Sequence, residues 1–134
     1  MIVKKAGCIL INKETKKIGL VYRQNKNDYS FPKGHLEEDE SLIECAIRET
    51  KEEVGRNCEI VSENIYIERY VTPSGEDVEM YYYLAIDKGS YDNTNEDSHD
   101  LVWMDFDKIE ETLSYPGLKL AWSNMKGVVM NAVF

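Results

Sequence analysis

Three glutamates are the residues whose types and spacing point most directly to chemistry. Glu49, Glu52 and Glu53 lie three and four positions apart, so on a helix they would share one face. Carboxylates this close repel one another, and a hard divalent cation with oxygen ligands removes that repulsion. Such a cation can make a water molecule nucleophilic and stabilise charge on phosphate oxygens, as phosphoanhydride hydrolysis requires. The competing interpretation is an ordinary solvated acidic helix.

The residues around these glutamates predict the helix that must position them. Ser41 and Glu44 have the spacing of a capping box, which marks a helix start. Gly55 stands where such a helix would end. The run from 41 to 54 is therefore predicted as a helix. Its apolar and semi-apolar residues fall mainly on the side away from the glutamates: Ile43, Ala46, Ile47, Thr50 and Val54.

Residues 34–56 carry a longer spaced pattern that includes this helix. Its fixed positions are Gly34, Glu40, Arg48, Glu49, Glu52, Glu53 and Gly55. The pattern resembles the box of the Nudix hydrolase family, G-x5-E-x7-R-E-U-x-E-E-x-G-U, in which U is a bulky apolar residue. Thr50 and Arg56 depart from it at two U positions. The charge of Arg56 predicts a less buried chain just after the helix.

The resemblance implies a role for each conserved box position of that family. The implied ligands of one or more Mg²⁺ or Mn²⁺ ions are the Gly34 carbonyl, Glu49, Glu52 and Glu53. Glu49 would serve either as a ligand or as the general base. Arg48 would orient a glutamate, and its alternative role is an exposed ion pair with Glu44 or Glu52. Glu40 fits a structural role as a helix-start charge favoured by the helix dipole.

The segment from Phe31 to His35 (FPKGH) resembles the start of the box in diadenosine tetraphosphate hydrolases and diphosphoinositol phosphate hydrolases. This resemblance implies that Lys33 and His35 lie near the substrate phosphates; an ordinary solvated lysine and histidine are the alternatives. It also aligns Tyr115 with a tyrosine that stacks on adenine in the dinucleotide hydrolases. Its alternative is a tyrosine that caps the core.

Two further positions extend the candidate site. Counting back from Trp103 aligns Asp97 with a metal-binding glutamate of the dinucleotide hydrolases, with Glu96 as its neighbour. The general base is therefore open among Glu49, Glu96 and Asp97. Tyr82 belongs to a tyrosine-rich stretch that offers either a base-stacking wall or core packing.

The implied reaction is cleavage of a nucleoside diphosphate linked to another moiety, with diadenosine tetraphosphate ranked first. Residues 73–77 (PSGED) argue against that ranking, because the dinucleotide hydrolases carry phosphate-gripping lysines in this loop. Missing basic residues disfavour an inositol substrate further. Three alternatives stay open: a pyrophosphohydrolase of intact or oxidised nucleoside triphosphates, an RNA-end-processing hydrolase, and a catalytically silent nucleotide-binding or protein-binding domain.

Composition bounds the class of protein. The 134 residues, 43% of them hydrophobic, fit a single domain over 1–134. A net charge of −9 argues against long nucleic acid as a partner. A small nucleotide stays possible, because metal ions can bridge the like charges of its phosphates and of the protein. Three cysteines without zinc spacing predict reduced thiols in a cytoplasmic protein, and no apolar stretch approaches the ~20 residues of a membrane span. Family members often dimerise, so the chain is expected to be a monomer or a homodimer.

Strand and helix patterns alternate along the chain. The predicted strands are 3–12, 17–23, 29–31, 58–71 (as one or two strands), 78–86 and 101–104, with loops at 33–39 and 88–100. Beyond the box helix, helices are predicted over 107–113 and from Pro116 onward. The apolar face of the last helix is predicted to consist of Leu118, Ala121, Trp122, Met125 and Val129. The pattern predicts an α/β fold with a mixed sheet between helices, and the resemblance selects the Nudix-type α/β/α sandwich.

Overall fold

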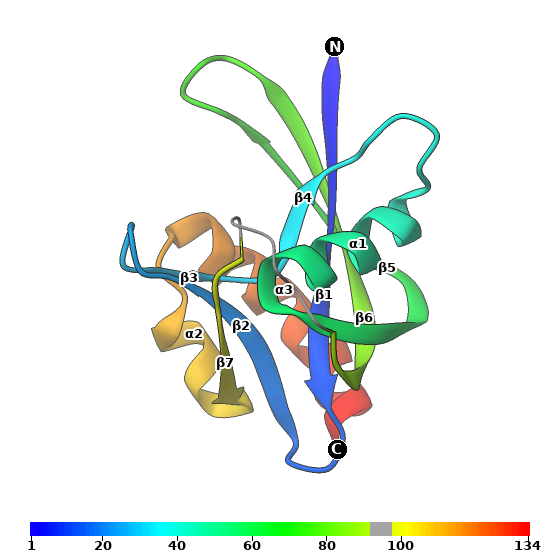
Figure 1. Cartoon of the computed structure of the whole chain (residues 1–134). Coiled ribbons are helices and arrows are strands. Elements are labelled where there is room, and N and C mark those ends of the chain that lie inside the picture. The colour runs from blue at the N-terminus through cyan, green and yellow to red at the C-terminus, as the bar shows by residue number, and fades with distance from the viewer. Residues whose placement is uncertain (92–97) are drawn as a thin grey trace.

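A mixed seven-stranded sheet lies at the centre of the computed structural model, which describes residues 1–91 and 98–134 (Figure 1). The strands are β1 (Ile2–Asn12), β2 (Lys17–Arg23), β3 (Asp28–Ser30), β4 (Lys33–His35), β5 (Arg56–Val71), β6 (Asp77–Ser90) and β7 (Asp100–Asp105). Five of them follow the order β3-β2-β1-β6-β5, while β4 pairs with β1 and β7 pairs with β2. β1 and β6 run parallel, and the other pairs are antiparallel.

Helices cover both faces of this sheet. The helix α1 (Leu42–Val54) packs on one face and α3 (Pro116–Val133) on the other, after the short η1 (Phe106–Lys108) and α2 (Ile109–Thr112). Side chains of β1 alternate between the two cores: Ile9 and Ile11 join the α3 side, and Cys8 and Leu10 join the α1 side. This arrangement confirms the predicted α/β/α sandwich. Within the described ranges, no helix is both long and apolar enough to cross a membrane.

Local sequence accounts for both ends of α1. The N–H of Glu44 donates to the Ser41 hydroxyl at 3.1 Å, and the N–H of Ser41 donates to the Glu44 carboxylate at 2.9 Å. Gly55 takes the left-handed conformation, with φ 64° and ψ 40°, and its N–H donates to the carbonyl of Lys51. The predicted capping box and helix end are therefore confirmed.

The predicted apolar face of the last helix is also confirmed. Its five predicted residues are all buried: Leu118, Ala121, Trp122, Met125 and Val129. Two predicted loops contain strand, however. The short β4 lies inside the expected loop 33–39 because its backbone pairs with residues 5–7 of β1. The long β6 continues to Ser90, inside the expected loop 88–100, because its end pairs with the start of β5.

Arg56 lies just after α1 in a stretch, residues 55–58, that is only half-buried, which agrees with the expectation of a less buried chain there. Its guanidinium donates two hydrogen bonds to the carboxylate of Asp87, at 2.8 and 2.6 Å, and lies over the ring of Trp103. The ion pair and the aromatic contact let a charged residue occupy a position where the family pattern has an apolar one.

Candidate active site

Gly34 allows the acidic face of α1 to approach β4 closely. The carboxylate of Glu49 fills the space that a side chain at position 34 would need, because a Cβ added there would lie 2.1 Å from Cδ of Glu49. The carbonyl of Gly34 accepts a weak hydrogen bond from the thiol of Cys45, with 3.6 Å between sulfur and oxygen. Position 34 therefore requires glycine because a carboxylate packs directly on its α-carbon.

Arg48 holds the acidic face together. Its guanidinium donates to both carboxylate oxygens of Glu40, at 2.6 and 3.0 Å, and to the carbonyl of His35 at 2.9 Å. The same group donates to Glu49 at 2.8 Å and to Glu52 at 3.0 Å. The Arg48 side chain is only 23% exposed, so its hydrogen bonds form a positioned network. The alternative role for Arg48, an exposed ion pair with Glu44 or Glu52, does not describe this arrangement.

Glu40 has a structural role for a reason other than the expected one. Its carboxylate clamps Arg48 and accepts the backbone N–H of Glu37 at 3.1 Å. Its hydrogen bond with Arg48 lowers the pKa of Glu40, and the same contact raises the pKa of Arg48. The residue therefore acts on the site by fixing the arginine that in turn contacts Glu49 and Glu52.

Burial makes the carboxylates of this face costly to ionise. It raises the pKa of Glu49 to about 7, against the opposing effect of Arg48, and nearby Glu53 and Glu52 add repulsion. Burial also raises the pKa of Glu53, although one of its oxygens, Oε1, accepts the backbone N–H of Lys33 at 2.7 Å. The loss of hydration on burial therefore outweighs the stabilisation that neighbouring cations and donors give to the ionised forms of Glu49 and Glu53.

The donor set fits a hard divalent cation. Among the described residues, Oε2 of Glu49 and Oε2 of Glu53 accept no hydrogen bond, so each glutamate keeps an oxygen that a metal could use. Those residues nevertheless contain no convergent group of three acidic, histidine or cysteine side chains. The reason is that Arg48 lies between Glu49 and Glu52, while Glu53 is turned toward the backbone of Lys33.

Two of the proposed metal or base residues, Glu96 and Asp97, lie outside the described residues. The chain soon after them does return to the box helix. The backbone N–H of His99 donates to the carbonyl of Glu53 at 2.7 Å, next to the glutamates.

Lys33 and Tyr115, both predicted to contact the substrate, line one cavity of about 230 Å³. Its lining residues are Lys33, Glu68, Tyr70, Tyr115, Gly117 and Leu118, contributed by β4, β5 and the start of α3. Burial lowers the pKa of Lys33, and the charge of Glu53 opposes that shift. The cavity thus adjoins the acidic face through Lys33, whose backbone N–H contacts Glu53.

An ion pair that the sequence did not reveal stands beside this cavity. Arg23 donates to both oxygens of the buried Asp28, at 2.8 and 2.5 Å, and Tyr115 also donates its hydroxyl to Asp28. The hydrogen bond from Arg23 lowers the pKa of Asp28 to about 2. Arg23 also favours the ionised form of Glu53. Asp28 stands in a polar stretch of the sequence, and nothing in that stretch indicates that it pairs with Arg23 and Tyr115.

His35 and Tyr82 fare differently from Lys33. His35 is exposed at the end of β4, and its backbone carbonyl is the atom that Arg48 contacts. Tyr82 is fully buried, packs against Phe31 with ring centroids 5.9 Å apart, and donates its hydroxyl to Glu68 at 2.9 Å. Its ring cannot form a base-stacking wall, which corrects the prediction for Tyr82.

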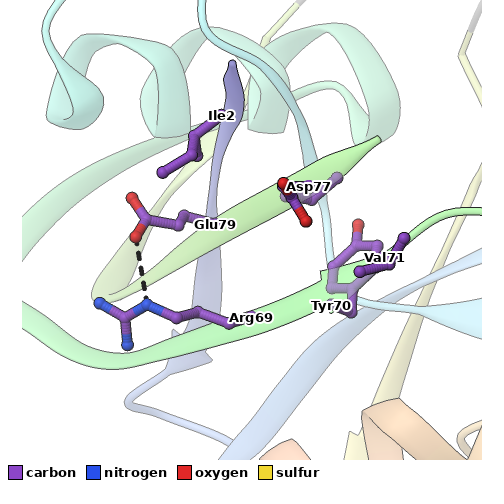
Figure 2. Close-up of a pocket in the computed structure, with 7 residues that line it drawn as sticks. Ile2, Arg69, Tyr70, Val71, Asp77 and Glu79 are labelled. Atoms are coloured by element: carbon purple, nitrogen blue, oxygen red, sulfur yellow. Dashed lines mark hydrogen bonds and ion pairs between the residues drawn. The ribbon is translucent and has the colours of Figure 1, made fainter. Parts of the chain in front are cut away.

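A second cavity, of about 360 Å³, opens where β5 ends and β6 begins (Figure 2). Its lining residues are Ile2, Arg69, Tyr70, Val71, Asp77, Val78 and Glu79. The close-up shows Arg69 and Glu79 joined across one side of it, at 3.1 Å. No box residue lines this cavity, so it does not belong to the acidic face.

Sequence relatives share the region of the chain that forms this site. The m7GpppN-mRNA hydrolase of Saccharomyces cerevisiae is 28% identical over 116 residues, which are 84% of this chain and 12% of that protein. The 8-oxo-(d)GTP phosphatase of Mycolicibacterium smegmatis is 28% identical over 102 residues, 76% of this chain and 31% of that protein. The chain therefore spans only 12% and 31% of the lengths of these two relatives.

The fold itself recurs in solved structures. An Ap4A hydrolase binary complex from C. elegans superposes with a TM-score of 0.76 at 22% sequence identity, covering 98% of this chain and 99% of that one. The family described as NUDIX domain matches residues 1–122, which include the whole box and β1 to β7. The chain therefore belongs to the NUDIX domain family.

Proposed function

We propose that this chain is a metal-dependent hydrolase that cleaves a phosphoanhydride bond of a nucleoside diphosphate linked to another moiety. One observation carries the proposal: Glu49, Glu52 and Glu53 share one face of α1. On that face Arg48 bridges Glu49 and Glu52, and Gly34 leaves room for the carboxylate of Glu49. A purely structural helix has no need to bury carboxylates whose pKa values are raised by that burial.

The residues divide the chemistry among themselves. Glu52 and Glu53 would hold Mg²⁺ or Mn²⁺, which when bound supplies charge neutralisation and an activated water. Glu49, with a pKa of about 7, can also exchange a proton near neutral pH, as a general base must. Arg48 positions Glu49 and Glu52 through its clamp on Glu40.

Lys33 is the residue best situated for the phosphate chain. Its backbone N–H is fixed on Glu53, and its side chain lines the cavity beside the acidic face. An ammonium in that position can meet a phosphate oxygen of a substrate bound beside Glu53. His35, exposed at the end of the same strand, is a second candidate contact.

The preferred substrate remains a dinucleoside polyphosphate such as diadenosine tetraphosphate, ranked above nucleoside triphosphates. The FPKGH segment supports this ranking, as does Tyr115 at the mouth of the cavity, where it is 45% exposed. The names of the sequence relatives favour alternatives, namely an oxidised guanosine triphosphate or a capped RNA end. The net charge of −9 favours the small substrates over the RNA.

A substrate screen with and without metal tests the proposal. The protein is incubated with dinucleoside polyphosphates, nucleotide sugars, triphosphates and a short capped RNA, each in Mg²⁺, Mn²⁺ or excess chelator. Glu53→Gln is the test variant, and Glu59→Gln is its matched control because Glu59 is exposed and, within residues 1–91 and 98–134, forms an ion pair with Lys88 alone, at 3.7 Å. Metal-dependent release of phosphate products that Glu53→Gln loses supports the proposal. Turnover that persists in chelator, or binding without turnover, contradicts it.

A further inference from the structure

The cavity beside Lys33 contains a carboxylate that the hydrolysis of phosphate does not use. Glu68 lines it from β5, and Lys33 lines it from β4. Glu68 and Lys33 attract each other electrostatically, but the described ion pairs do not join them. A negatively charged group beside a polyphosphate site repels phosphate, so it needs a different purpose.

One oxygen of Glu68 is already engaged and the other is available. The hydroxyl of Tyr82 donates to Oε1 at 2.9 Å from the core side. Oε2 lies near the first turn of α3, where a Cβ added to Gly117 would stand 3.3 Å from it. Within residues 1–91 and 98–134, Oε2 accepts no hydrogen bond. The carboxylate is therefore fixed in direction by Tyr82 and presents an unused acceptor.

Two aromatic side chains complete the cavity. Tyr70 belongs to β5, and Tyr115 directly precedes α3. Tyr115 is held by its hydroxyl on Asp28, which Arg23 fixes in turn. A flat ligand with hydrogen-bond donors on its edge matches aromatic surfaces beside a carboxylate, and a nucleobase is such a ligand.

We propose that Glu68 selects a guanine base in this cavity. The inference rests on the proposed function and revises the base of its preferred substrate, so that diguanosine tetraphosphate ranks above diadenosine tetraphosphate. Guanine presents two adjacent donors, N1–H and the 2-amino group; Oε2 can accept one, and the lone pair of Oε1 that Tyr82 leaves unused can accept the other. Adenine presents its amino group beside a ring-nitrogen acceptor, and that acceptor would face the negative charge of Glu68. The carboxylate therefore favours guanine and disfavours adenine.

The test compares substrates that differ only in the base. kcat/KM is measured for diguanosine and diadenosine tetraphosphate, and for GTP, ITP and ATP. A bidentate contact of this kind discriminates by about 10-fold or more, so guanine should exceed adenine by at least that ratio. ITP, which lacks the 2-amino group, should fall between GTP and ATP. Equal rates for guanine and adenine substrates would overturn the inference while leaving the proposed function intact.

Variants separate base selection from a structural role of Glu68. Glu68→Gln still accepts the Tyr82 hydroxyl but replaces one acceptor by a donor, so the guanine preference should disappear while activity on adenine substrates is kept. Glu79→Gln, on the neighbouring strand and outside this cavity, should keep the preference. A preference that Glu68→Gln retains contradicts the inference. So does a Glu68→Gln loss that is the same for both bases, which would indicate a structural role.

Direct binding keeps the inference testable without turnover. Calorimetry with GDP and ADP should give tighter binding of GDP to the wild type and no difference for Glu68→Gln. Selective GDP binding without hydrolysis of any substrate would sink the proposed function and retain the inference. Slow reaction of 2′-deoxy substrates with no base preference would assign Glu68 to the ribose and overturn the inference.

Discussion

Replacing Gly34 by alanine puts a methyl group where the Glu49 carboxylate lies. The new Cβ would stand 2.1 Å from Cδ and 2.2 and 2.4 Å from the two oxygens, whereas ordinary van der Waals contact begins at 3.4 Å. Either the carboxylate retreats or β4 shifts on β1. Both movements disturb the 2.8 Å hydrogen bond that Arg48 donates to Glu49. The perturbation is therefore local to the proposed catalytic carboxylate.

The structure sets the size of the expected effect. Displacing a catalytic group by about 1 Å costs ~10²-fold in rate, so kcat/KM should fall by that factor or more. The strained contact and the weakened charged hydrogen bond should lower the free energy of unfolding by about 1–3 kcal/mol. The loss of activity should thus exceed what the loss of folded protein explains, because most molecules stay folded.

A second glycine provides the control. Gly127 lies in α3, and a Cβ added there would have no atom of the described residues within 4 Å. Gly127→Ala should leave the rate unchanged and raise the free energy of unfolding by about 0.5–1 kcal/mol. The assay pairs metal-dependent kcat/KM with urea unfolding in chelator for both variants. If Gly34→Ala retains activity within a few-fold of wild type, the contact between position 34 and Glu49 does not control catalysis, and the reasoning fails.

Three further predictions follow from the acidic face. Glu53→Gln should be neutral or mildly stabilising in chelator, because burial raises the pKa of Glu53. The same variant should lose metal-dependent activity by ~10³-fold or more. Melting curves in chelator and rates with metal check both, and a large loss of stability would mean that Glu53 has a structural role. Without metal, the raised pKa of Glu49 means that the folded state holds its proton longer, so stability should decline as pH rises from about 4.5 to about 7, and Glu49→Gln should lack this decline in pH-dependent urea unfolding. Arg48→Lys cannot reproduce the two-pronged contact with Glu40 and should lower unfolding free energy by about 1–3 kcal/mol and also lower kcat; unchanged values for both would show that the clamp is dispensable.

Local sequence predicts those parts of the fold that local contacts create. Ser41, Glu44 and Gly55 determine the ends of α1 through hydrogen bonds within a few residues, so their spacing was sufficient. The three residues of β4 become a strand only because β1, almost thirty residues earlier, offers its edge. Arg56 likewise finds Asp87 across a strand pair. Neither partnership leaves a mark in the neighbouring sequence.

The candidate site shows the same division. Spacing on one helix was enough to group Glu49, Glu52 and Glu53, and the box resemblance added Arg48. Residues 78–86 alternate so that Tyr82 shares a face of the strand with Met80 and Leu84, and this pattern is enough to favour core packing of Tyr82 over a stacking wall. Glu68 and Tyr115 meet in one cavity although they are far apart in the chain. Such a juxtaposition depends on how β5 and α3 pack, which no local pattern encodes.

Arg48 also affects whether the protein can fold without a bound metal ion. Its guanidinium serves as an internal counter-ion, so the acidic helix can fold before any metal ion arrives. A cation that binds there would compete with Arg48 for Glu49 and Glu52, and this competition would weaken its binding and speed its exchange. Chelation should accordingly silence the protein without unfolding it. A metal held by this face would act as an exchangeable reagent, in contrast to the zinc ions around which small domains are built.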